Sequence, residues 1–504
     1  MSRYIIGVDQ STSGTTVILI DDAGEVVAVR KLAIKRYTPQ LGWVEQDATE
    51  IWLATRSALR AVIQDARVSP DEIESIGIAN QRETIVVWDR HTGEPSGRAI
   101  GWQDRRTLEF CEKVDPSDRD RLEDETGMLL LTNSAGPKIE WLLSHDRNVQ
   151  RGMADGRLIC GTVDSWLMWN LSGGKSHVSD HSNASVTMLQ DARTLSYSER
   201  AIDFFGIPRG VLPALRSSSE TLAYTAPEHT FGVEIPITGC AGDQQASMFG
   251  VGCIRPGMAK NTYGAGNFTM LNVGDHYQPP SHGTFSPVLW SANGTVTYGV
   301  EYMTDDAGSV LDWLRDGLRI IGEAREAESL ALQVPDSGGL HFIPSLGQQP
   351  TDRRSPAASR AKPGHSGGLL MGLTHQSTRQ HIARAALEAI AFQARDALEA
   401  IQTSAGISPA VLRVDGAGAR NDFLMQFQAD ILGIPVERPR TVETTAVGAA
   451  YLAGLAVGFW DSVAEVEANW RLDKVFEPRL STDARDELYQ KWVDAMGYSS
   501  TLNT

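Results

Sequence analysis

The first residues of the chain alternate between apolar runs and a cluster of small, hydroxyl-bearing residues. Residues 4–8 and 17–20 are apolar, and residues 9–16 between them are mostly Ser, Thr and Gly. This order predicts a buried strand, a tight turn and a return strand. Further along, residues 48–65 carry apolar side chains at helical spacing, so we expect a helix there.

The same hydrophobic pattern appears twice more. The polar segment 80–83 separates two apolar runs, which predicts another hairpin over 76–88. Near the middle of the chain, residues 257–271 contain two strand-like runs around the small-residue turn 264–267. Because a strand–turn–strand unit recurs in both halves, we expect a duplicated, two-domain architecture. Each unit could offer backbone N–H groups to a phosphate chain from one side of a cleft.

The second half of the chain is more helical. Residues 377–402 have the spacing of an amphipathic helix. A short strand is predicted over 411–414, followed by the glycine-rich segment 415–421 and a helix over 423–432. A glycine-rich turn between a strand and a helix N-terminus suits a nucleotide. The Pro-rich, locally basic segment 345–364 is typical of a mobile surface loop.

The net charge and the cysteine content exclude some classes of partner and of site. The 504 residues include 46 Lys and Arg against 63 Asp and Glu, a formal charge of −17. This argues against nucleic acid or an anionic membrane as the main partner. The four cysteines lie far apart, and we expect buried, reduced thiols rather than a zinc or redox site. The longest apolar stretch, 447–460, is too short to span a bilayer, and we expect a cytoplasmic protein.

Three small-residue turns, at 9–16, 264–267 and 416–421, are candidates for phosphate binding. Phosphoryl transfer depends on backbone N–H groups and Mg²⁺ to hold the charge of the phosphate oxygens. Asp9, at the end of a predicted strand, could orient a hydrated Mg²⁺. The alternative for any one of these segments is a plain surface turn.

Two further clusters could carry chemistry. Asp243 follows an apolar run and could accept a proton from a substrate hydroxyl, or it could simply cap a helix over 244–249. Arg82 and Glu83 offer a donor beside an acceptor, and Trp102 offers an aromatic face. Together these groups would suit a polyol, whose hydroxyls bond to the charges while its carbons lie on the ring. The alternative is a surface ion pair.

Several blocks in order resemble the FGGY carbohydrate kinases over nearly the whole chain. The two family signature regions correspond to 134–143 and 368–388. The blocks are GWVEQD at 42–47, NQRET at 80–84, WQDRR at 102–106, GTVDSWL at 161–167, AGDQQ at 241–245, AKNTYG at 259–264 and LMQFQADILG at 424–433.

The resemblance implies an α/β protein with two RNase H-like (actin-like ATPase) domains, 1–250 and 251–504, and a catalytic cleft between them. It implies ATP-dependent phosphorylation of a terminal hydroxyl of a small polyol, with Mg²⁺, and glycerol is the first expectation. The alternatives are a four- or five-carbon polyol or ketose such as erythritol, threitol, xylitol or xylulose, or a family member that binds without turnover. It also implies a homo-oligomer, either a dimer or a tetramer.

By position, the resemblance assigns roles to individual residues. Asp243 is the expected catalytic base, and it joins Asp9 at the metal. The expected polyol contacts are Arg82, Glu83, Trp102, Asn133, Asp243, Gln244 and Phe268. The expected nucleotide contacts are Ser11, Thr12, Ser13, Gly264, Ala265, Gly308, Ala417 and Asn421.

The chain also departs from the family pattern. The family has a basic residue at Thr16 and a tyrosine at Asn133, and an aromatic loop is replaced by residues 347–352. Basic residues within 353–362 are candidates to add positive charge near the phosphates. The remaining departures, each in a phosphate-facing turn, are Ser11, Ala265 and Ala417. These departures motivate both the longer-substrate and the non-catalytic alternatives.

Overall fold

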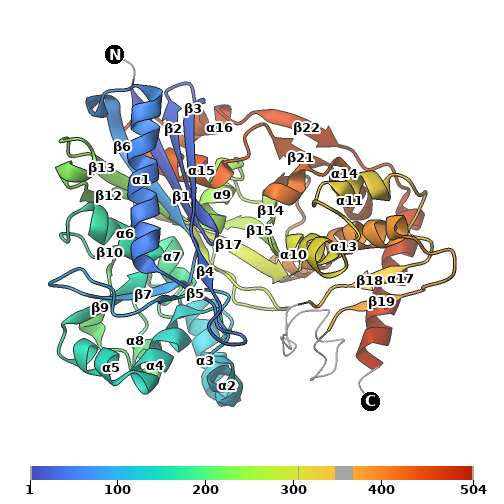
Figure 1. Cartoon of the computed structure of the whole chain (residues 1–504), viewed down its shortest axis with the longest axis horizontal. Helices are drawn as coiled ribbons and strands as arrows, with labels where there is room; N and C mark the ends of the chain where they lie inside the picture. Colours follow the sequence, from blue (N-terminus) through green and yellow to red (C-terminus); the bar gives the residue numbers. More distant parts are fainter. Residues whose placement is uncertain (1–2, 305, 347–366, 502–504) are drawn as a thin grey trace.

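The computed structural model describes residues 3–304, 306–346 and 367–501. Within these residues, thirteen strands form one mixed sheet that runs through both halves of the molecule (Figure 1). In spatial order, the first half contributes β3 (Val26–Ala33), β2 (Gly14–Asp21), β1 (Tyr4–Ser11), β6 (Ile73–Asn80), β13 (Pro236–Gly242) and β12 (Ser219–Tyr224). The second half contributes β17 (Thr295–Thr304), β15 (Asn267–Gly274), β14 (Ala259–Tyr263), β20 (Leu412–Asp415), β21 (Val436–Pro439) and β22 (Leu472–Phe476). Strand β16 (Val288–Ala292) lies between β12 and β17 and joins the two sets.

The two sets repeat the same strand pattern. From β3 to β12 the successive pairs are antiparallel, antiparallel, parallel, parallel and antiparallel. From β17 to β22 the pairs follow the same sequence. The expected duplication is therefore present as two α/β halves of one topology, and the predicted fold class is confirmed.

Smaller sheets and helices surround the main sheet. A five-stranded sheet consists of β4 (Arg36–Tyr37), β5 (Glu45–Gln46), β8 (Ala99–Ile100), β7 (Ile85–Asp89) and β9 (Leu158–Thr162), and two strand pairs consist of β10 (Val178–Asp180) with β11 (Ala214–Arg216) and β18 (His341–Ile343) with β19 (Leu369–Met371). The α-helices are α1 (Ala48–Ala66), α2 (Leu108–Lys113), α3 (Pro116–Thr126), α4 (Ala135–His145), α5 (Arg147–Ala154), α6 (Val163–Leu171), α7 (His181–Ser185), α8 (Glu199–Phe204), α9 (Asp243–Gly250), α10 (Gly308–Asp312), α11 (Glu326–Ala331), α13 (Arg379–Ala405), α14 (Asp422–Leu432), α15 (Thr444–Ala456), α16 (Val463–Ala468) and α17 (Thr482–Thr501).

The first predicted hairpin is present, but its turn is shorter than expected. Strands β1 and β2 pair up to Ser11 and Gly14, so only Thr12 and Ser13 form the turn. Asp9 therefore lies inside a strand, opposite Thr16. Along this part of the ladder Asp9, Ser11 and Thr16 are half-buried, whereas Gln10 and Thr15 are buried.

The second predicted hairpin, over 76–88, is wrong. Strand β6 lies in the main sheet between β1 and β13, whereas β7 lies in the five-stranded sheet. Residues 76–80 of β6 are all buried and pair in parallel on both sides, which leaves no edge for an antiparallel return strand. The polar segment 80–83 instead crosses from one sheet to the other.

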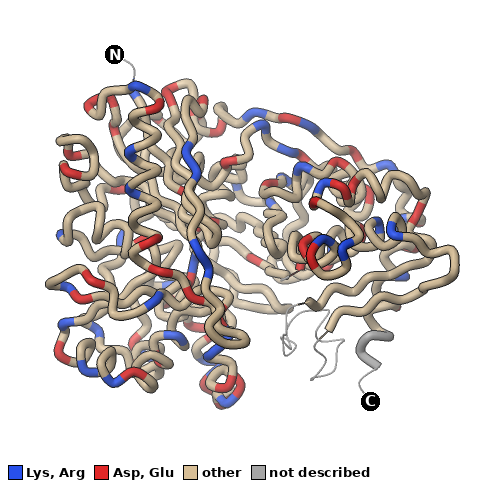
Figure 2. The backbone as a smooth tube through the Cα atoms, viewed as in Figure 1, with Lys and Arg blue, Asp and Glu red and all other residues tan. Residues whose placement is uncertain are grey.

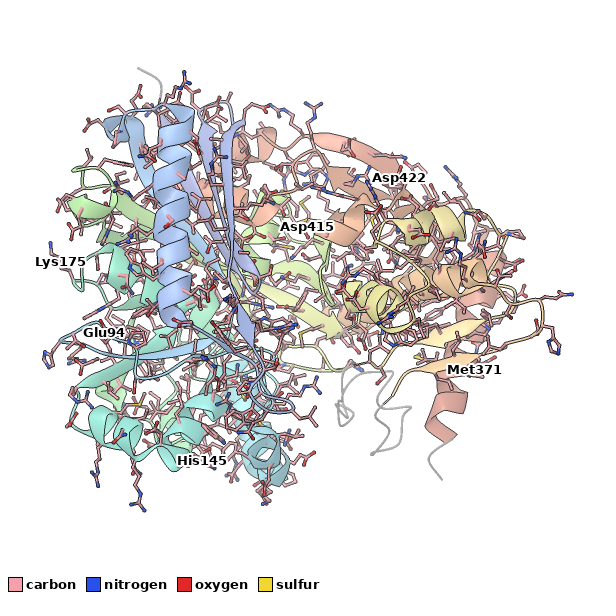
Figure 3. The ribbon with its side chains drawn as sticks, in the orientation of Figure 1. Glu94, His145, Lys175, Met371, Asp415 and Asp422 are labelled. Atoms are coloured by element: carbon pink, nitrogen blue, oxygen red, sulfur yellow. The ribbon has the colours of Figure 1, made fainter. Side chains whose placement is uncertain are left out.

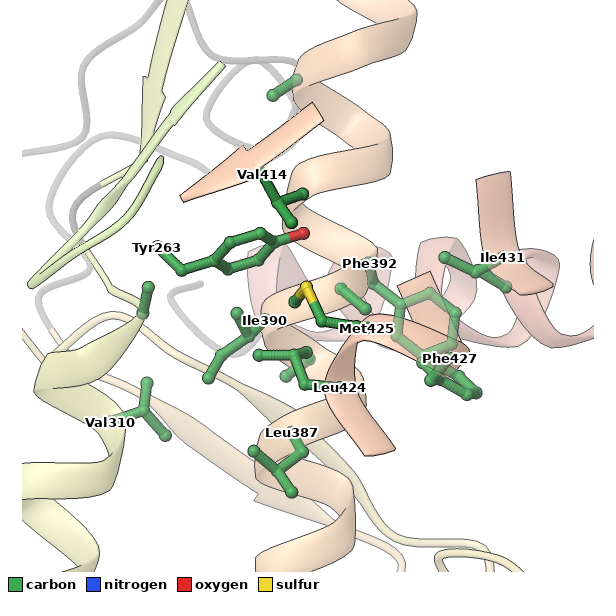
Figure 4. Close-up of a cluster of buried hydrophobic side chains, with 14 of the residues drawn as sticks. Tyr263, Val310, Leu387, Ile390, Phe392, Val414, Leu424, Met425, Phe427 and Ile431 are labelled. Carbon is green, nitrogen blue, oxygen red and sulfur yellow. The ribbon is translucent and has the colours of Figure 1, made fainter. Parts of the chain in front are cut away.

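Other elements agree with the sequence pattern. Helix α1 begins where Asp47 accepts hydrogen bonds from the N–H groups of Thr49 and Glu50. Helices α13 and α14 pack on the second half of the sheet, where Tyr263 of β14 lies in a buried apolar cluster (Figure 4). The Tyr263 hydroxyl donates to Gln428 Oε1 at 2.7 Å. The four cysteines are buried free thiols, as expected.

Helix α15 ties the two halves together. It belongs to the second half of the chain but packs on β1, β6 and β13 of the first half and against α9 (Figure 1). Much of the apolar run 447–460 is this helix, which is buried inside the protein. No helix among the residues described above is long and apolar enough to cross a membrane.

Acidic and basic residues are interspersed along both halves of the backbone (Figure 2). The net charge of −17 is thus distributed over the molecule. The replaced segment 347–352 and the basic segment 353–362, with most of the predicted loop 345–364, lie outside the described residues.

The crossing of α9 and α15 predicts a sensitive glycine. A Cβ added at Gly448 would lie 1.8 Å from the Ala246 carbonyl oxygen, and one at Gly250 would lie 1.9 Å from that of Thr444. Gly448→Ala must push the helices apart, and overpacking of this kind costs about 2 kcal/mol. We expect that loss in the free energy of unfolding from urea titration. Gly97→Ala, where a Cβ meets nothing within 4 Å, is the matched control. Equal stability of the two variants would contradict the close crossing.

Candidate active site

Asp243 lies where β13 ends and α9 begins, at the junction of the two halves. Gly242 occupies the N-cap position, so Asp243 is the first helical residue rather than the expected cap. Its Oδ1 accepts from the backbone N–H of Gln244 at 2.8 Å and lies 3.4 Å from Nε of Arg82. The side chain is 26% exposed. Its Oδ2 has no hydrogen-bond partner in the described part of the chain and remains available to a ligand.

Arg82 is held in place by a buried carboxylate. Its two terminal nitrogens donate to the two oxygens of Glu301 on β17, at 2.7 and 2.6 Å. Glu301 is fully buried, and Arg82 is 6% exposed. The bidentate geometry fixes the guanidinium plane, so that Nε faces Asp243. Burial raises the pKa of Asp243, while the positive charges of Arg82 and Lys260 lower it.

Glu83 stands next to Arg82 in the crossing segment and is held by two residues. Asn133 Nδ2 donates to both of its carboxylate oxygens, at 3.0 and 2.9 Å. The buried Lys138 Nζ donates to the backbone oxygens of Glu83 and Asn133, at 2.9 and 2.5 Å. Arg82 and Glu83, the donor and acceptor that the sequence predicts, are thus both held in fixed positions. Both residues are buried, which excludes the alternative of a surface ion pair.

Trp102 connects this cluster to the first turn. Its indole N–H donates to Thr12 Oγ1 at 2.8 Å. The ring also meets Phe268 of β15 edge-on, with centroids 6.1 Å apart. The Trp102 backbone N–H donates to Thr84 Oγ1 at 3.1 Å, so the ring pair, one ring from each half of the chain, adjoins the residue that follows Glu83. This combination can hold a small molecule that has both carbon and hydroxyl surfaces.

The remaining residues of the first turn maintain its shape. Ser11 Oγ donates to the Gly14 carbonyl oxygen at 3.0 Å. The carbonyl oxygen of Ser13 accepts from Ile34 N–H at 3.1 Å.

A second group of predicted residues gathers around the β14–β15 turn. The N–H of Gly308 donates to the Gly264 carbonyl oxygen at 2.9 Å, and Ala265 accepts from Ala307 and Ser309. A Cβ at Gly308 would lie 2.6 Å from the Gly264 oxygen. The Ala265 turn and the start of α10 are therefore in direct backbone contact.

The glycine-rich turn after β20 lies against the same strand. Gly416 has φ +83°, and a Cβ there would lie 2.5 Å from the Tyr263 oxygen. Ala417 begins a 3₁₀ turn, and Asn421 caps α14 by accepting from Leu424 N–H at 2.8 Å. Gly308 and Ala417 thus both adjoin the end of β14, next to residues 263 and 264.

Asp9 fits a hydrated cation. Its Oδ1 is buried without a hydrogen-bond partner in the described part of the chain. Burial, with the negative charge of Asp243 next in effect, raises the pKa of Asp9 to about 8. Carboxylate oxygens are ligands that Mg²⁺ prefers, and a bound cation would favour the charged form of Asp9. The structure therefore leaves a carboxylate oxygen unsatisfied where the sequence predicts a metal.

Comparison with known proteins agrees with this site. The chain matches the N-terminal domain model of the FGGY family of carbohydrate kinases over residues 4–250 and the C-terminal domain model over 259–457. The chain belongs to the FGGY family of carbohydrate kinases. The fold and family expected from the sequence are thereby confirmed, and the chain is a carbohydrate kinase.

Individual relatives cover nearly the whole chain. It is 43% identical to the glycerol kinase of Geobacillus kaustophilus strain HTA426 over 98% of this chain and 99% of that protein. It is equally similar to the glycerol kinase of Thermus thermophilus, over the same shares of the two chains. The crystal structure of Plasmodium falciparum glycerol kinase with ADP superposes with a TM-score of 0.88 at 31% identity, covering 99% of this chain and 98% of that one. The ligand-bound xylulose kinase of Lactobacillus acidophilus, at 22% identity and a TM-score of 0.84 over 98% and 97% of the two chains, shares the fold.

Two of the recognised FGGY blocks meet at a single arginine. The Arg106 guanidinium lies 3.7 Å from the centre of the Trp43 ring and 4.9 Å from that of Trp141. It also donates to Asp104 and Glu45, each at 2.8 Å. These contacts join the GWVEQD block to the WQDRR block.

Sequence reasoning missed the role of Glu301 in this FGGY site. A Glu within the apolar run 298–302 is a signal, because an acid in a strand buried on both faces needs a cation. The identity of that cation could not be predicted, since Arg82 is 219 residues away along the chain.

The variant Glu301→Gln tests how much the buried Arg82–Glu301 pair contributes to the free energy of unfolding. The change keeps the side-chain size but leaves Arg82 buried with less countercharge. Removing one partner of such a pair costs about 3 kcal/mol, and we expect that decrease in the free energy of unfolding from urea titration. Glu109→Gln, which removes the acid of the exposed pair with Lys113, serves as a control that should show no measurable change. If both variants unfold alike, the Arg82–Glu301 pair does not stabilise the site.

Proposed function

We propose that the protein transfers the γ-phosphoryl group of ATP to a terminal hydroxyl of glycerol. The observation that carries this proposal is the free Oδ2 of Asp243, in a carboxylate held 3.4 Å from the buried Arg82. In this proposal Glu83 supplies an acceptor for the polyol, and Trp102 and Phe268, whose rings meet edge-on, supply the apolar contacts. The glycerol kinases that match almost the full length of the chain support the same substrate.

In this mechanism Asp243 is the general base. Its Oδ2 accepts the proton of the hydroxyl that attacks the γ-phosphorus in line. Arg82 and Glu83 orient the remaining hydroxyls, and Trp102 and Phe268 contact the carbons. Closing the two halves over the substrates would exclude water and so limit ATP hydrolysis.

Asp9 and Asp243 would hold Mg²⁺ with its water ligands, and the cation would neutralise charge on the phosphates. The turns at residues 11–13 and 264–265, with Gly308, Ala417 and Asn421, would contact the nucleotide. The ADP-bound Plasmodium falciparum structure supports a nucleotide in this fold.

A longer acceptor is the second candidate, and Asn133 favours it. The short Asn133 side chain binds both oxygens of Glu83 and occupies less space than the expected tyrosine. A four- or five-carbon polyol or ketose would use that space. A dimer or tetramer and a cytoplasmic location also remain predictions.

The first experiment measures coupled ADP release with glycerol, dihydroxyacetone, erythritol, threitol, xylitol and xylulose. We expect the highest kcat/KM with glycerol. If a longer polyol gives the higher kcat/KM, that polyol and not glycerol is the substrate. Absence of turnover with all six compounds would contradict the proposed reaction.

Asp243→Asn decides whether turnover comes from this site. Loss of the general base should lower kcat by ~10² to 10⁴ while the isosteric amide preserves the fold. The matched control is Asp312→Asn, an exposed aspartate, which should retain wild-type kcat. Activity retained by Asp243→Asn would remove the proposed base.

Lys31 offers the positive charge that Thr16 lacks. Asp9, Thr16 and Lys31 are directly opposite one another on β1, β2 and β3, so they share one face of the sheet. Lys31 Nζ lies 2.7 Å from Oε1 of Glu443, at the start of α15. From this row, Lys31 can exchange its carboxylate partner for a phosphate oxygen.

We therefore expect Lys31→Met to raise the KM for ATP by about tenfold, the effect of losing one charge-assisted hydrogen bond. The KM for the polyol should stay unchanged. Arg30→Met is the control, because Arg30 is the next residue on β3 and pairs with Asp65 instead. An unchanged KM for ATP in Lys31→Met would remove Lys31 from the phosphate site.

A further inference from the structure

Lys260 is a fully buried cation between the two halves of the molecule. Its ammonium group, on β14, donates three hydrogen bonds: to Gln244 Oε1 at 2.6 Å, to Ser247 Oγ at 3.0 Å and to Thr262 Oγ1 at 2.5 Å. A lysine ammonium has three protons and no acceptor. All of its hydrogen-bonding capacity is therefore used by these three partners.

The proton positions in this cluster follow from that fact. Because the hydroxyls of Ser247 and Thr262 accept from Lys260, each must donate its own proton elsewhere. Both donate to Asp415, at 2.5 Å, as does the hydroxyl of Thr444. Three hydroxyl donors therefore converge on one carboxylate. The cluster is thus a directed network from a buried cation to a buried anion.

The network joins the two sides of the candidate site. Gln244 and Ser247 belong to α9 of the first half, whereas Lys260, Thr262 and Asp415 belong to the second. Asp415, labelled where the two halves meet in Figure 3, ends β20 immediately before the glycine-rich turn on the proposed nucleotide side. Gln244 follows Asp243 on the proposed polyol side.

The lysine also determines how the Gln244 amide is oriented. Since Lys260 can only donate, Gln244 must turn its oxygen toward the lysine. The amide nitrogen, Nε2, then points the other way and has no hydrogen-bond partner among residues 3–304, 306–346 and 367–501. Gln244 as a whole is 7% exposed, and Nε2 is not among the fully buried donors that lack a partner, so it is accessible to a ligand beside Asp243. A substrate hydroxyl can accept from this donor.

We propose that Lys260 is a positioning residue for the phosphoryl acceptor: it orients the Gln244 amide so that Nε2 donates to a substrate hydroxyl next to Asp243. The inference rests on the proposed function, since it needs a hydroxyl-bearing substrate in this pocket. Burial lowers the pKa of Lys260, and the nearby carboxylates of Asp415, Glu301 and Asp243 oppose that effect.

A double-mutant cycle tests the proposal. Steady-state kinetics would be measured for Lys260→Met, Gln244→Ala and the double variant, with the polyol that the wild-type protein phosphorylates best. We expect the KM for the polyol to rise about tenfold in each single variant, and no further in the double variant, because both lose the same hydrogen bond. A rise of the KM for the polyol near a hundredfold in the double variant would mean that the two effects multiply, and it would overturn the proposal. An unchanged KM in Lys260→Met would overturn it as well.

Matched variants separate positioning from stability. Lys260→Met leaves Asp415 buried without its cation, so Lys260→Met/Asp415→Asn, which removes both charges, should recover the urea midpoint but not the KM for the polyol. Recovery of both would overturn the proposal. Thr444→Val removes a donor to Asp415 without contacting Gln244, and the KM for the polyol should stay within twofold of wild type. A tenfold rise in the KM for the polyol in Thr444→Val would show that any disturbance of the hydrogen-bond network raises this KM, and it would overturn the specific role of Lys260.

The wild-type protein distinguishes failure of this inference from failure of the proposed function. If the wild type turns over none of the polyols, the proposed reaction fails, and calorimetric binding of glycerol to the same variants tests the inference directly. Weaker binding in Lys260→Met and Gln244→Ala, with no further loss in the double variant, would support it. Equal binding in all variants would overturn it.

Discussion

The close crossing of α9 and α15 is the contact on which the rest of the site depends. At Gly250 and Gly448 the two helices approach backbone to backbone, with no room for a side chain at either position. Helix α9 begins with Asp243, and α15 begins with Thr444, so the crossing fixes the first turns of both helices. It also sets α15, from the second half of the chain, against β1, β6 and β13 of the first. Any widening of the crossing would displace Asp243 relative to Asp415.

Buried charge at this junction is balanced locally. Arg82 pairs with Glu301, and Lys260 pairs with Asp415 through two hydroxyls. Each arrangement holds a functional side chain by means of a charge that never meets the solvent: Arg82 faces Asp243, and Lys260 fixes Gln244. Because each of these cations is neutralised by a buried carboxylate, neither offsets the net charge of −17. Their effect is to hold neighbouring side chains in place, and the charge of a phosphate chain is left to other groups.

Local patterns in the sequence predicted those elements whose partners are adjacent along the chain. The hairpins β1–β2 and β14–β15, helix α1, and the succession of β20 and α14 are of this kind. The hairpin over 76–88 was predicted wrongly because apolar runs report burial but do not report which strand lies alongside. Arg82, Glu83 and Asp243 could be proposed from their chemistry and from the family resemblance. Glu301 and Lys260 could not, because their roles depend on partners brought together only by the sheet and the helix crossing.

The backbone at Glu83 shows how the site maintains a costly conformation. Its φ is +65°, in the left-handed region that a glutamate rarely adopts and that costs about 1 kcal/mol or more. The crossing from β6 to the smaller sheet requires this reversal directly after Arg82. Lys138 donates to the Glu83 carbonyl oxygen and Asn133 to its carboxylate, so both the backbone and the side chain are held in the strained state. The strain is offset by a buried cation, and the reversal seats the Glu83 carboxylate on Asn133 directly after Arg82, which reaches Glu301 and Asp243. In an extended backbone the side chains of adjacent residues point to opposite faces, so a relaxed Glu83 would lose the contacts that hold its carboxylate here.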